Sequence, residues 1–232
     1  FVRGLAHEIK NPLSGIRGSA QLLSNKLDNQ DLQEYTDIII KQTDRLTSLV
    51  DNILGPNKKP DFQFQNIHYP IENVLNLIDN ESGYEDIKII KDFDPSIPDL
   101  FIDSYLIENS ILNLTKNARD ALIDSNTSNP EINIVTRISH GEMIDGEKNA
   151  MVCKISIIDN GPGIHEDIKD SIFFPMITGK DKGTGLGLSI TQGIISQHKG
   201  NIHFTSEPNR TEFFINIPVN TQKDIDLKTS NG

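Results

Sequence analysis

Two narrow apolar stripes occupy the first part of the chain and predict a pair of helices. Their apolar positions recur at steps of three and four residues, the period of one helix face. A polar break at 28–30 separates the stripes, and Gly55-Pro56 ends the second. The first stripe comprises Leu5, Ile9, Leu13, Ile16, Ala20, Leu23 and Leu27, and the second Leu32, Tyr35, Ile39, Gln42, Leu46, Leu49 and Ile53.

The short connection makes these two helices antiparallel neighbours. A single hairpin covers only half of two such stripes, so pairing with a second copy into a four-helix bundle is the economical way to bury them. We therefore expect residues 1–56 to form the dimerisation domain of a homodimer. The alternative is a hairpin that packs against the C-terminal domain of its own chain.

The pattern changes after a linker at 57–61, which contains Lys58, Lys59 and Pro60. Beyond it, apolar runs predict strands at 87–93, 131–138, 151–158, 201–205 and 211–217. Helical patterns cover 70–80, 104–125 with Ser104 as the N-cap, and 186–198. We expect residues 62–220 to form an α/β sandwich, a mixed sheet covered by helices. A polar hairpin loop is expected at 139–150 and a disordered tail at 221–232.

The charge balance of the 232-residue chain limits its function. With 33 acidic and 22 basic side chains, it is poorly suited to bind nucleic acid directly. No run of eighteen apolar residues predicts a membrane span. The only cysteine, Cys153, lies in an apolar strand pattern, so we expect it to be structural. The sequence begins at Phe1 inside a helical pattern, which favours a fragment of a longer protein.

The predicted helix at 104–125 has one apolar side and one carboxamide side. At about 100° per residue, each set of side chains falls within its own sector. Such a polar row could simply be solvated, but the glycine-rich segments that follow favour a binding site. The apolar sector comprises Ile107, Ile111, Leu114 and Ala118, and the polar sector comprises Asn109, Asn113, Asn117 and Asp120.

The first glycine-rich segment, Asp159-Asn160-Gly161-Pro162-Gly163, directly follows a predicted buried strand. A carboxylate at a strand end can accept hydrogen bonds from an exocyclic amine. The glycines allow the backbone to approach a flat ring closely. These features favour recognition of a heterocyclic base.

The second glycine-rich segment, 183–188, begins a predicted helix. The free amides and the dipole of a helix N-terminus favour phosphate. No strand directly precedes the segment, so it does not match the dinucleotide-binding fingerprint. Between the two segments, Phe173 to Lys182 is apolar at its start and basic at its end, which predicts a lid over bound nucleotide.

In this order, the carboxamide helix, the DxGxG strand end, the lid and GTGLGL resemble the GHKL nucleotide-binding domain of Hsp90, type II topoisomerases, MutL proteins and histidine kinases. The resemblance implies that the chain binds ATP with Mg²⁺. It implies that Asn117 ligates Mg²⁺ with help from Asn113, and that Asp159 recognises adenine N6. The further ligands it implies are Gly161 and Gly163 around the adenine, and Lys180, Thr184, Gly185, Leu186 and Gly187 around the phosphates.

His7 is the candidate nucleophile. It lies two residues from both Leu5 and Ile9, so it faces away from the apolar stripe. A carboxylate such as Glu8 that accepts the Nδ1 proton leaves Nε2 free to attack a γ-phosphate. Asn11, one turn further on, can position a water for hydrolysis of a phosphorylated partner. A lone exposed histidine would most often be a solvated surface residue.

The segment His7-Glu8-Ile9-Lys10-Asn11-Pro12-Leu13 is similar to the H box of sensor histidine kinases, in the form found in members that are both kinases and phosphatases. Residues 6–23, Phe174-Pro175-Met176 and 210–213 resemble the nitrogen-regulation branch of that family. This implies autophosphorylation on His7, phosphotransfer to an aspartate of an NtrC-like response regulator, and phosphatase activity. It also implies a cytoplasmic homodimer, a missing N-terminal PAS sensor and control by PII protein.

Two departures from the family pattern are present. Many histidine kinases carry a lysine where this chain has Asp120, and Lys116 or Arg119 could replace its phosphate contact. The usual Gly-Thr before an aromatic residue is Arg210-Thr211 here. For the remaining histidines we expect solvated or structural roles; they are His68, His140, His165, His198 and His203.

Two other functions are compatible with parts of the sequence. One is a non-catalytic nucleotide-binding dimerisation module with His7 unused, against which the complete set of nucleotide motifs argues. The other is a GHKL-type ATPase, but such enzymes activate water with a glutamate one turn before the Mg²⁺ ligand, and position 113 is Asn. The sequence leaves open whether His7 would be phosphorylated by its own chain or by its dimer mate.

Overall fold

A computed structural model describes residues 2–27, 29–54, 60–79, 81–144, 146–177 and 185–220. Among these, the side chains of 2–10, 30, 31, 45, 48–54, 147 and 148 are not described. The chain divides into two compact units, residues 1–59 and 60–232. The predicted tail at 221–232 and most of the predicted linker at 57–61 lie outside the described residues.

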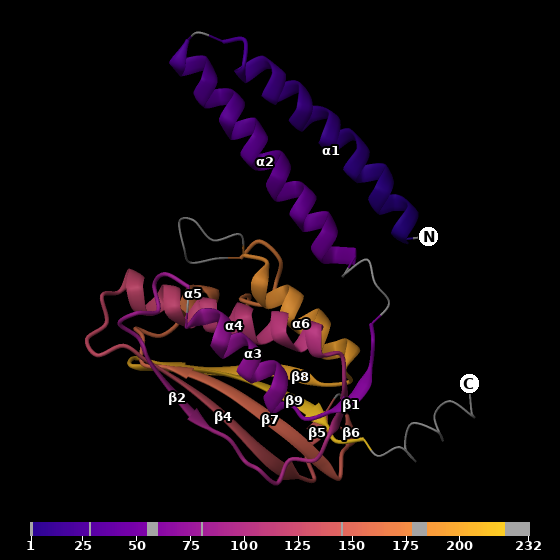
Figure 1. The fold of residues 1–232 in the computed structure, drawn as a ribbon, viewed down its shortest axis with the longest axis vertical. Helices are drawn as coiled ribbons and strands as arrows, with labels where there is room; N and C mark the ends of the chain where they lie inside the picture. Colours follow the sequence, from indigo (N-terminus) through magenta and orange to yellow (C-terminus); the bar gives the residue numbers. More distant parts are fainter. Residues whose placement is uncertain are drawn as a thin grey trace. The chain divides into compact units, whose positions relative to one another are not determined.

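The first unit is an antiparallel helical hairpin of α1 (Val2–Ser24) and α2 (Gln30–Leu54), as Figure 1 shows. Leu13 and Ala20 of α1 are buried, and so are Thr36 and Thr43 of α2, whose hydroxyls donate to backbone carbonyls of their own helix. An ion pair of 2.6 Å joins the two helices through Arg17 and Asp44. Both helices expected from the apolar periodicity are therefore present.

The hairpin leaves much of both apolar stripes uncovered. Ile16 is 49% exposed and Tyr35 is 65% exposed, and Leu23, Leu32, Ile39 and Leu46 are exposed as well. The free energy gained by burying apolar surface is about 25 cal/mol per Å², so this face gains stability from any apolar cover. The exposed stripe is what the homodimer requires, and the homodimer itself stays a prediction.

The second unit contains a five-stranded mixed sheet with helices on one face (Figure 1). The strand order is β2 (Lys88–Asp92), β4 (Glu131–His140), β7 (Met151–Asp159), β9 (Arg210–Pro218) and β8 (Asn201–Glu207). Only β2 and β4 are parallel, and the other neighbours are antiparallel. The covering helices are α3 (His68–Ile78), α4 (Ser104–Asp124) and α6 (Gly187–Gln197). The predicted α/β sandwich is thus confirmed.

The core lies between α4 and the covered face of the sheet. The apolar sector of α4 is buried as its spacing predicts, with Ile107, Ile111 and Leu114 fully enclosed. Alternate residues of the central strands, such as Ile134 and Ile155, are fully buried in the same cluster. Cys153 of β7 is also enclosed, and burial raises the pKa of its thiol to about 12. This confirms its structural role.

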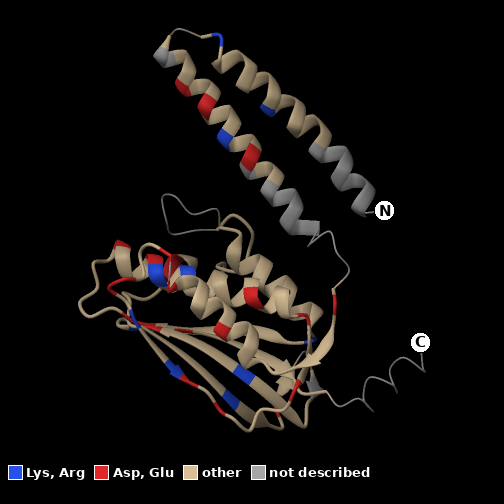
Figure 2. Ribbon diagram, in the orientation of Figure 1, with Lys and Arg blue, Asp and Glu red and all other residues tan. Residues whose placement is uncertain are grey.

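The opposite face of the sheet carries ion pairs and hydrogen bonds between strands. On β9, the Glu212 carboxylate accepts from Ser156 Oγ at 2.8 Å and lies 3.3 Å from Lys154 Nζ. Burial would raise the pKa of Glu212, but the Ser156 hydrogen bond and Lys154 lower it. Lys88 and Glu131 pair at 3.0 Å between β2 and β4. Figure 2 shows basic and acidic residues interspersed along these strands.

Several local features differ from the sequence predictions. The N-cap of α4 is Asp103 and not Ser104, because Asp103 has extended backbone angles and its side chain accepts from the Leu106 N–H. The predicted loop at 139–150 contains the paired strands β5 (Met143–Ile144) and β6 (Glu147–Lys148). Three short elements were not predicted: β1 (Gln63–Gln65), β3 (Leu100–Ile102) and α5 (Glu166–Lys169). No helix in the described parts of the chain is long and apolar enough to cross a bilayer.

Candidate functional site

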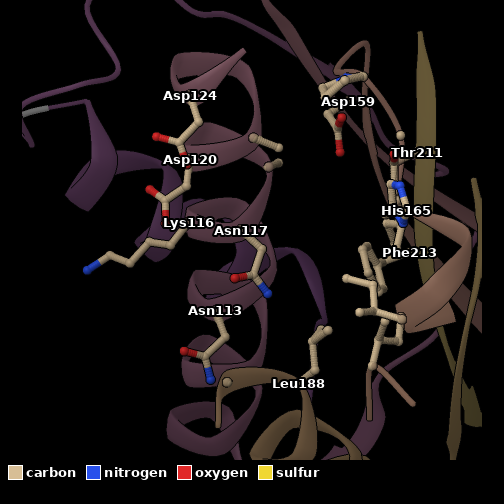
Figure 3. Close-up of a pocket in the computed structure, with 18 of the residues that line it drawn as sticks. Asn113, Lys116, Asn117, Asp120, Asp124, Asp159, His165, Leu188, Thr211 and Phe213 are labelled. Carbon is tan, nitrogen blue, oxygen red and sulfur yellow. The ribbon is translucent and has the colours of Figure 1, made fainter. Parts of the chain in front are cut away.

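A cavity of about 590 Å³ lies between α4 and the segments that follow β7. One wall is the polar side of α4, with Asn113, Lys116, Asn117 and Asp120. Figure 3 shows Asp159, Thr211, His165 and Phe213 across the cavity from Asn117. Of the polar sector of α4, Asn113, Asn117 and Asp120 therefore face a cavity rather than open solvent, whereas Asn109 does not line it.

The structure brings together six of the residues predicted to bind nucleotide. These are Asn113, Asn117, Asp159, Gly163, Gly185 and Gly187, and all line the one cavity. Gly161 and Leu186 are adjacent in sequence to lining residues but do not line it. Lys180 and Thr184 lie outside the described residues.

The predicted phosphoacceptor residues belong to the other unit. His7 and Glu8 are on α1, but their side chains lie outside the described part. Asn11 is on the same helix, and its side chain is exposed. Their chemical roles stay predictions.

The position of Asp159 follows from the sheet. It is the last residue of β7, its side chain is buried, and its Oδ1 accepts from the Gly161 N–H at 2.9 Å. A Cβ on Gly161 would lie 2.7 Å from that same oxygen, so glycine is needed for this contact. Gly161 therefore orients the carboxylate without lining the cavity itself, and its predicted part in shaping an adenine pocket stays a prediction.

The turn after β7 is hydrogen-bonded to the hairpin of β8 and β9. The Ile164 N–H donates to Ser206 Oγ at 2.8 Å, and that hydroxyl lies 3.2 Å from Thr211 Oγ1. Gly163 has a φ of +90°, and a Cβ there would lie 3.1 Å from the Glu207 carbonyl oxygen. Ile164, Ile168 and Ile172 add apolar lining. An apolar slot with a carboxylate and a hydroxyl at its end suits a flat heterocycle that carries an amine.

The start of α6 forms the other end of the cavity. A Cβ added to Gly187 would lie 3.7 Å from Asn113 Oδ1, so the helix begins directly beside this carboxamide. The N-cap Leu186 has no side-chain oxygen to accept from the first amides of α6. Such an N-terminus favours an anion through its N–H groups and its dipole.

The described start of the predicted lid is hydrogen-bonded to the glycine-rich segment that follows the lid. The Met176 N–H donates to the Gly185 carbonyl at 2.9 Å. Gly185 has a φ of +67°, and a Cβ there would lie 2.5 Å from the Met176 carbonyl carbon. Only glycine fits this close approach. The rest of the predicted lid, residues 178–182, lies outside the described part.

Some lining residues were missed or assigned no role from the sequence. His165 is the N-cap of α5 and lines the cavity, although no site was expected for it. Thr211 and Phe213 line it because the β7–β9 register places β9 beside Asp159, and pairing of this kind is not visible in the sequence.

Lys116 and Arg119, the two residues expected to replace a lysine absent at position 120, lie in different environments. Lys116 lines the cavity, and its Nζ lies 3.1 Å from Glu81. Arg119 does not line it, because its guanidinium is held by Asp120 at 2.8 Å and lies over the ring of Tyr84. Burial lowers the pKa of Arg119, but the hydrogen bond to Asp120 and the negative charges of Asp120, Tyr84 and Glu81 together raise that pKa.

The donor set fits Mg²⁺ held jointly by protein and phosphate. Among the described residues, no cluster of three or more His, Cys, Asp or Glu side chains could hold a metal alone. Mg²⁺ usually takes one or two protein oxygens and completes its octahedron with water and substrate phosphates. The carboxamide oxygens of Asn113 and Asn117, beside a helix N-terminus, are suitable for that arrangement.

Comparison with known proteins agrees with this geometry. Over 219 residues the chain is 46% identical to the sensory histidine kinase/phosphatase NtrB of Vibrio alginolyticus, and 45% identical to that of Escherichia coli O157:H7. The NtrB of Rhodobacter capsulatus is 39% identical over 223 residues. These alignments cover 93 to 94% of this chain, and the chain spans 60 to 62% of the length of these relatives.

Solved structures of histidine kinases have the same fold. The kinase ThkA in complex with the response regulator protein TrrA is 27% identical with a TM-score of 0.58, over 94% of this chain and 60% of that chain. Its catalytic domain alone is 28% identical with a TM-score of 0.56, over 68% of this chain and 96% of that chain. Full-length ShkA in complex with AMPPNP shares the fold at 23% identity and a TM-score of 0.62, over 95% and 46% of the two chains.

Family models match both units of the chain. Residues 1–59 match the His Kinase A (phospho-acceptor) domain. Residues 102–221, more than half of the chain, match the histidine kinase-, DNA gyrase B- and HSP90-like ATPase family. With its cavity built from the carboxamides of α4, Asp159 and the start of α6, this chain belongs to that ATPase family, and it is similar to NtrB over 94% of its length.

Proposed function

We propose that this chain binds ATP with Mg²⁺ and transfers the γ-phosphoryl group to its own His7, as the catalytic core of a nitrogen-regulation sensor kinase. The observation that carries the proposal is the convergence of Asn113 and Asn117 from α4, Asp159 from β7 and Gly187 from α6 on one cavity. These residues come from three separate elements, and each has the chemistry that one part of ATP requires.

Each part of the nucleotide has a partner in this proposal. The Asp159 carboxylate accepts from the adenine N6 amine, and the apolar slot with Ile164 and Phe213 encloses the ring. Asn117 ligates Mg²⁺ with assistance from Asn113. The phosphates lie against Gly185, Gly187 and the first amides of α6, with Leu186, Lys180 and Thr184 as the remaining contacts. Bound Mg²⁺ would neutralise charge on the phosphates.

The phosphoryl transfer requires a nucleophile with a free electron pair. Nε2 of a neutral His7 supplies that pair, so an N–P bond forms while the bond from phosphorus to the bridging oxygen of ADP breaks. Glu8, the next residue, accepts the Nδ1 proton and fixes the tautomer. A general base of this kind contributes about 10² to 10⁴ in rate.

The next acceptor in the proposal is an aspartate of a response regulator. The NtrB relatives are named kinase/phosphatases and ThkA is found in complex with the response regulator TrrA, and both facts support a regulator as partner. We propose that it is NtrC-like, and that Asn11, exposed on α1, positions the water that hydrolyses its phosphorylated form. A cytoplasmic homodimer under PII control completes the proposal. The exposed stripe on α1 and α2 supports the dimer.

Incubation with γ-labelled ATP and Mg²⁺ tests this function. We expect an acid-labile, alkali-stable label on the parent chain and none on His7→Gln or Asn117→Ala. His7→Gln should still bind nucleotide, because position 7 lies in the other unit. Acid-stable label on another residue would overturn the His7 assignment. Bound nucleotide without any label would favour the non-catalytic module, and phosphate release without label would favour the ATPase.

A further inference from the structure

The first residues of the second unit form a strap, defined here as residues 61–65, that is tied to the nucleotide-binding helices. Its end is β1, which pairs antiparallel with β3. Its beginning is held by a hydrogen bond of 2.7 Å from the Asp61 N–H to Asp103 Oδ2. Phe62 stacks on Phe101 with ring centroids 5.5 Å apart. The strap is thus held by backbone pairing, ring stacking and a buried carboxylate.

Asp103 makes hydrogen bonds through both of its carboxylate oxygens and through its backbone N–H. Oδ1 accepts from the Leu106 N–H at 3.1 Å, which caps α4, and Oδ2 accepts from the strap. Its own N–H donates to His198 Nε2 at 3.0 Å. A buried carboxylate with two amide donors is held firmly in place, since loss of either bond leaves a buried polar group unpaired.

His198 ends α6 and completes the connection. Its side chain is buried, and Nδ1 lies 2.8 Å from the Ile194 carbonyl, so the neutral ring donates from Nδ1 and accepts at Nε2. The ring of Phe62 also contacts it, with centroids 4.8 Å apart. The start of α4, the end of α6 and the strap therefore meet at Asp103 and His198.

The cavity is lined by α4 from its middle at Asn113 onward and by the start of α6, the end of that helix opposite His198. Asn113 lies about 15 Å along α4 from Asp103, at about 1.5 Å per residue. Gly187 at the start of α6 lies directly beside Asn113. Helices behave as stiff rods in a close-packed interior, which transmits displacement rather than absorbing it. A displacement of Asp103 relative to His198 should therefore change the spacing between Asn113 and Gly187.

We propose that Asp103 is a positioning residue that couples the strap to the nucleotide site. The strap lies at the start of the second unit in the chain. The proposal rests on the nucleotide-binding function proposed above. Coupling between two sites is reciprocal, so bound nucleotide must also tighten the strap.

Amide hydrogen exchange of residues 61–65 tests the coupling in the whole chain. The probe is a non-hydrolysable ATP analogue with Mg²⁺, whose binding is measured by calorimetry on the same samples. We expect the saturating analogue to slow exchange of the strap amides by about fivefold or more, the lower range of typical coupling. Unchanged exchange at saturation would overturn the proposal while leaving nucleotide binding intact. Failure to bind the analogue would overturn both.

Asp103→Asn and Asp103→Ser isolate the role of the second oxygen. Both residues remain good N-caps, so α4 stays capped, but each has a single acceptor oxygen and cannot place one at both the Oδ1 and the Oδ2 positions. We expect the analogue to bind about fivefold or more weakly and to lose its effect on strap exchange. Asp99→Asn is the matched control, because it removes the same charge from the exposed loop before β3. Strap protection that persists in both Asp103 variants would contradict the proposal.

Discussion

Asp159 on β7 and Thr211 on β9 are direct partners in the sheet register, and both line the same cavity. The Asp159 carboxylate accepts a hydrogen bond from the Gly161 amide, and the Thr211 hydroxyl is hydrogen-bonded to the Ser206 hydroxyl. The sheet register therefore positions the two polar groups at the end of the apolar slot, where an adenine would present its hydrogen-bonding edge.

Asp159→Asn should weaken ATP binding by about tenfold to a hundredfold. A hydrogen bond to a charged acceptor contributes about 1.5 to 3 kcal/mol, and the amide retains the shape while losing the charge. Calorimetric titration with the ATP analogue measures the change. Ser156→Ala, on the opposite face of the same strand, is the control and should leave affinity unchanged. Unaltered affinity in Asp159→Asn would exclude this carboxylate as the base ligand.

Asn117→Ala should weaken Mg²⁺-dependent nucleotide binding by about tenfold or more, because even the outer partners of metal ligands contribute that much. The variant's affinity with Mg²⁺ should approach the parent's affinity measured in a chelator. Asn109→Ala provides the comparison, since Asn109 is on the same helix but does not line the cavity. Equal effects of both substitutions would indicate a general loss of α4 rather than a lost ligand.

Two glycine substitutions should have different consequences. Gly200 directly precedes β8, and Gly200→Ala would place a Cβ 2.2 Å from the carbonyl oxygen of Asn216 on β9. We therefore expect the free energy of unfolding to fall by about 1 to 3 kcal/mol. Gly185→Ala would displace the backbone of Met176 and Ile177 beside the cavity, and it should chiefly reduce nucleotide affinity. Denaturant unfolding and calorimetry on both variants separate the two effects. A Gly185→Ala chain with parental affinity would contradict the inferred place of phosphate.

Stability should fall as the pH drops below about 6.5. Burial lowers the pKa of both His198 and His68 from the ordinary value of 6.5. The unfolded chain then binds more protons than the folded chain, so the free energy of unfolding decreases between 6.5 and the lowered values. Glu212, whose pKa lies below the usual 4.5, adds its own loss only at lower pH.

Melting temperatures between pH 7.5 and 5 measure this dependence. His198→Gln keeps an acceptor for the Asp103 amide but does not titrate, so its curve should be flatter than the parent's. His203→Gln serves as a comparison, since His203 lies on the exposed side of β8. A parental slope in His198→Gln would exclude His198 as a source of the effect.

The elements with long periodic patterns could be predicted from the sequence. The apolar sector of α4 and the alternation in β9 are buried as their spacing requires. Short elements could not be predicted, because β1 and β3 are three residues each and depend on pairing between distant segments. The N-cap is a similar case: both Asp103 and Ser104 are good caps, and only the backbone angles at Asp103 decide between them.

The candidate site follows the same rule. The sequence could predict Asn113, Asn117 and Asp159 as site residues, because helix periodicity and a strand end fix the directions of their side chains. It could not predict His165 and Thr211, because a turn brings His165 to the cavity and the strand register brings Thr211 there. Local patterns predict which way a side chain points from its own element, whereas tertiary packing decides what lies opposite.

The enclosure of Cys153 gives the chain a built-in reporter. Only the thiolate reacts with labelling reagents, and a thiol with a pKa of about 12 at the centre of the sheet forms almost none at neutral pH. Since the chain has a single cysteine, its modification by a thiol reagent records opening of β7 itself. For the same reason, a cysteine introduced at a surface position would be the one site that accepts a fluorophore while the sheet stays closed.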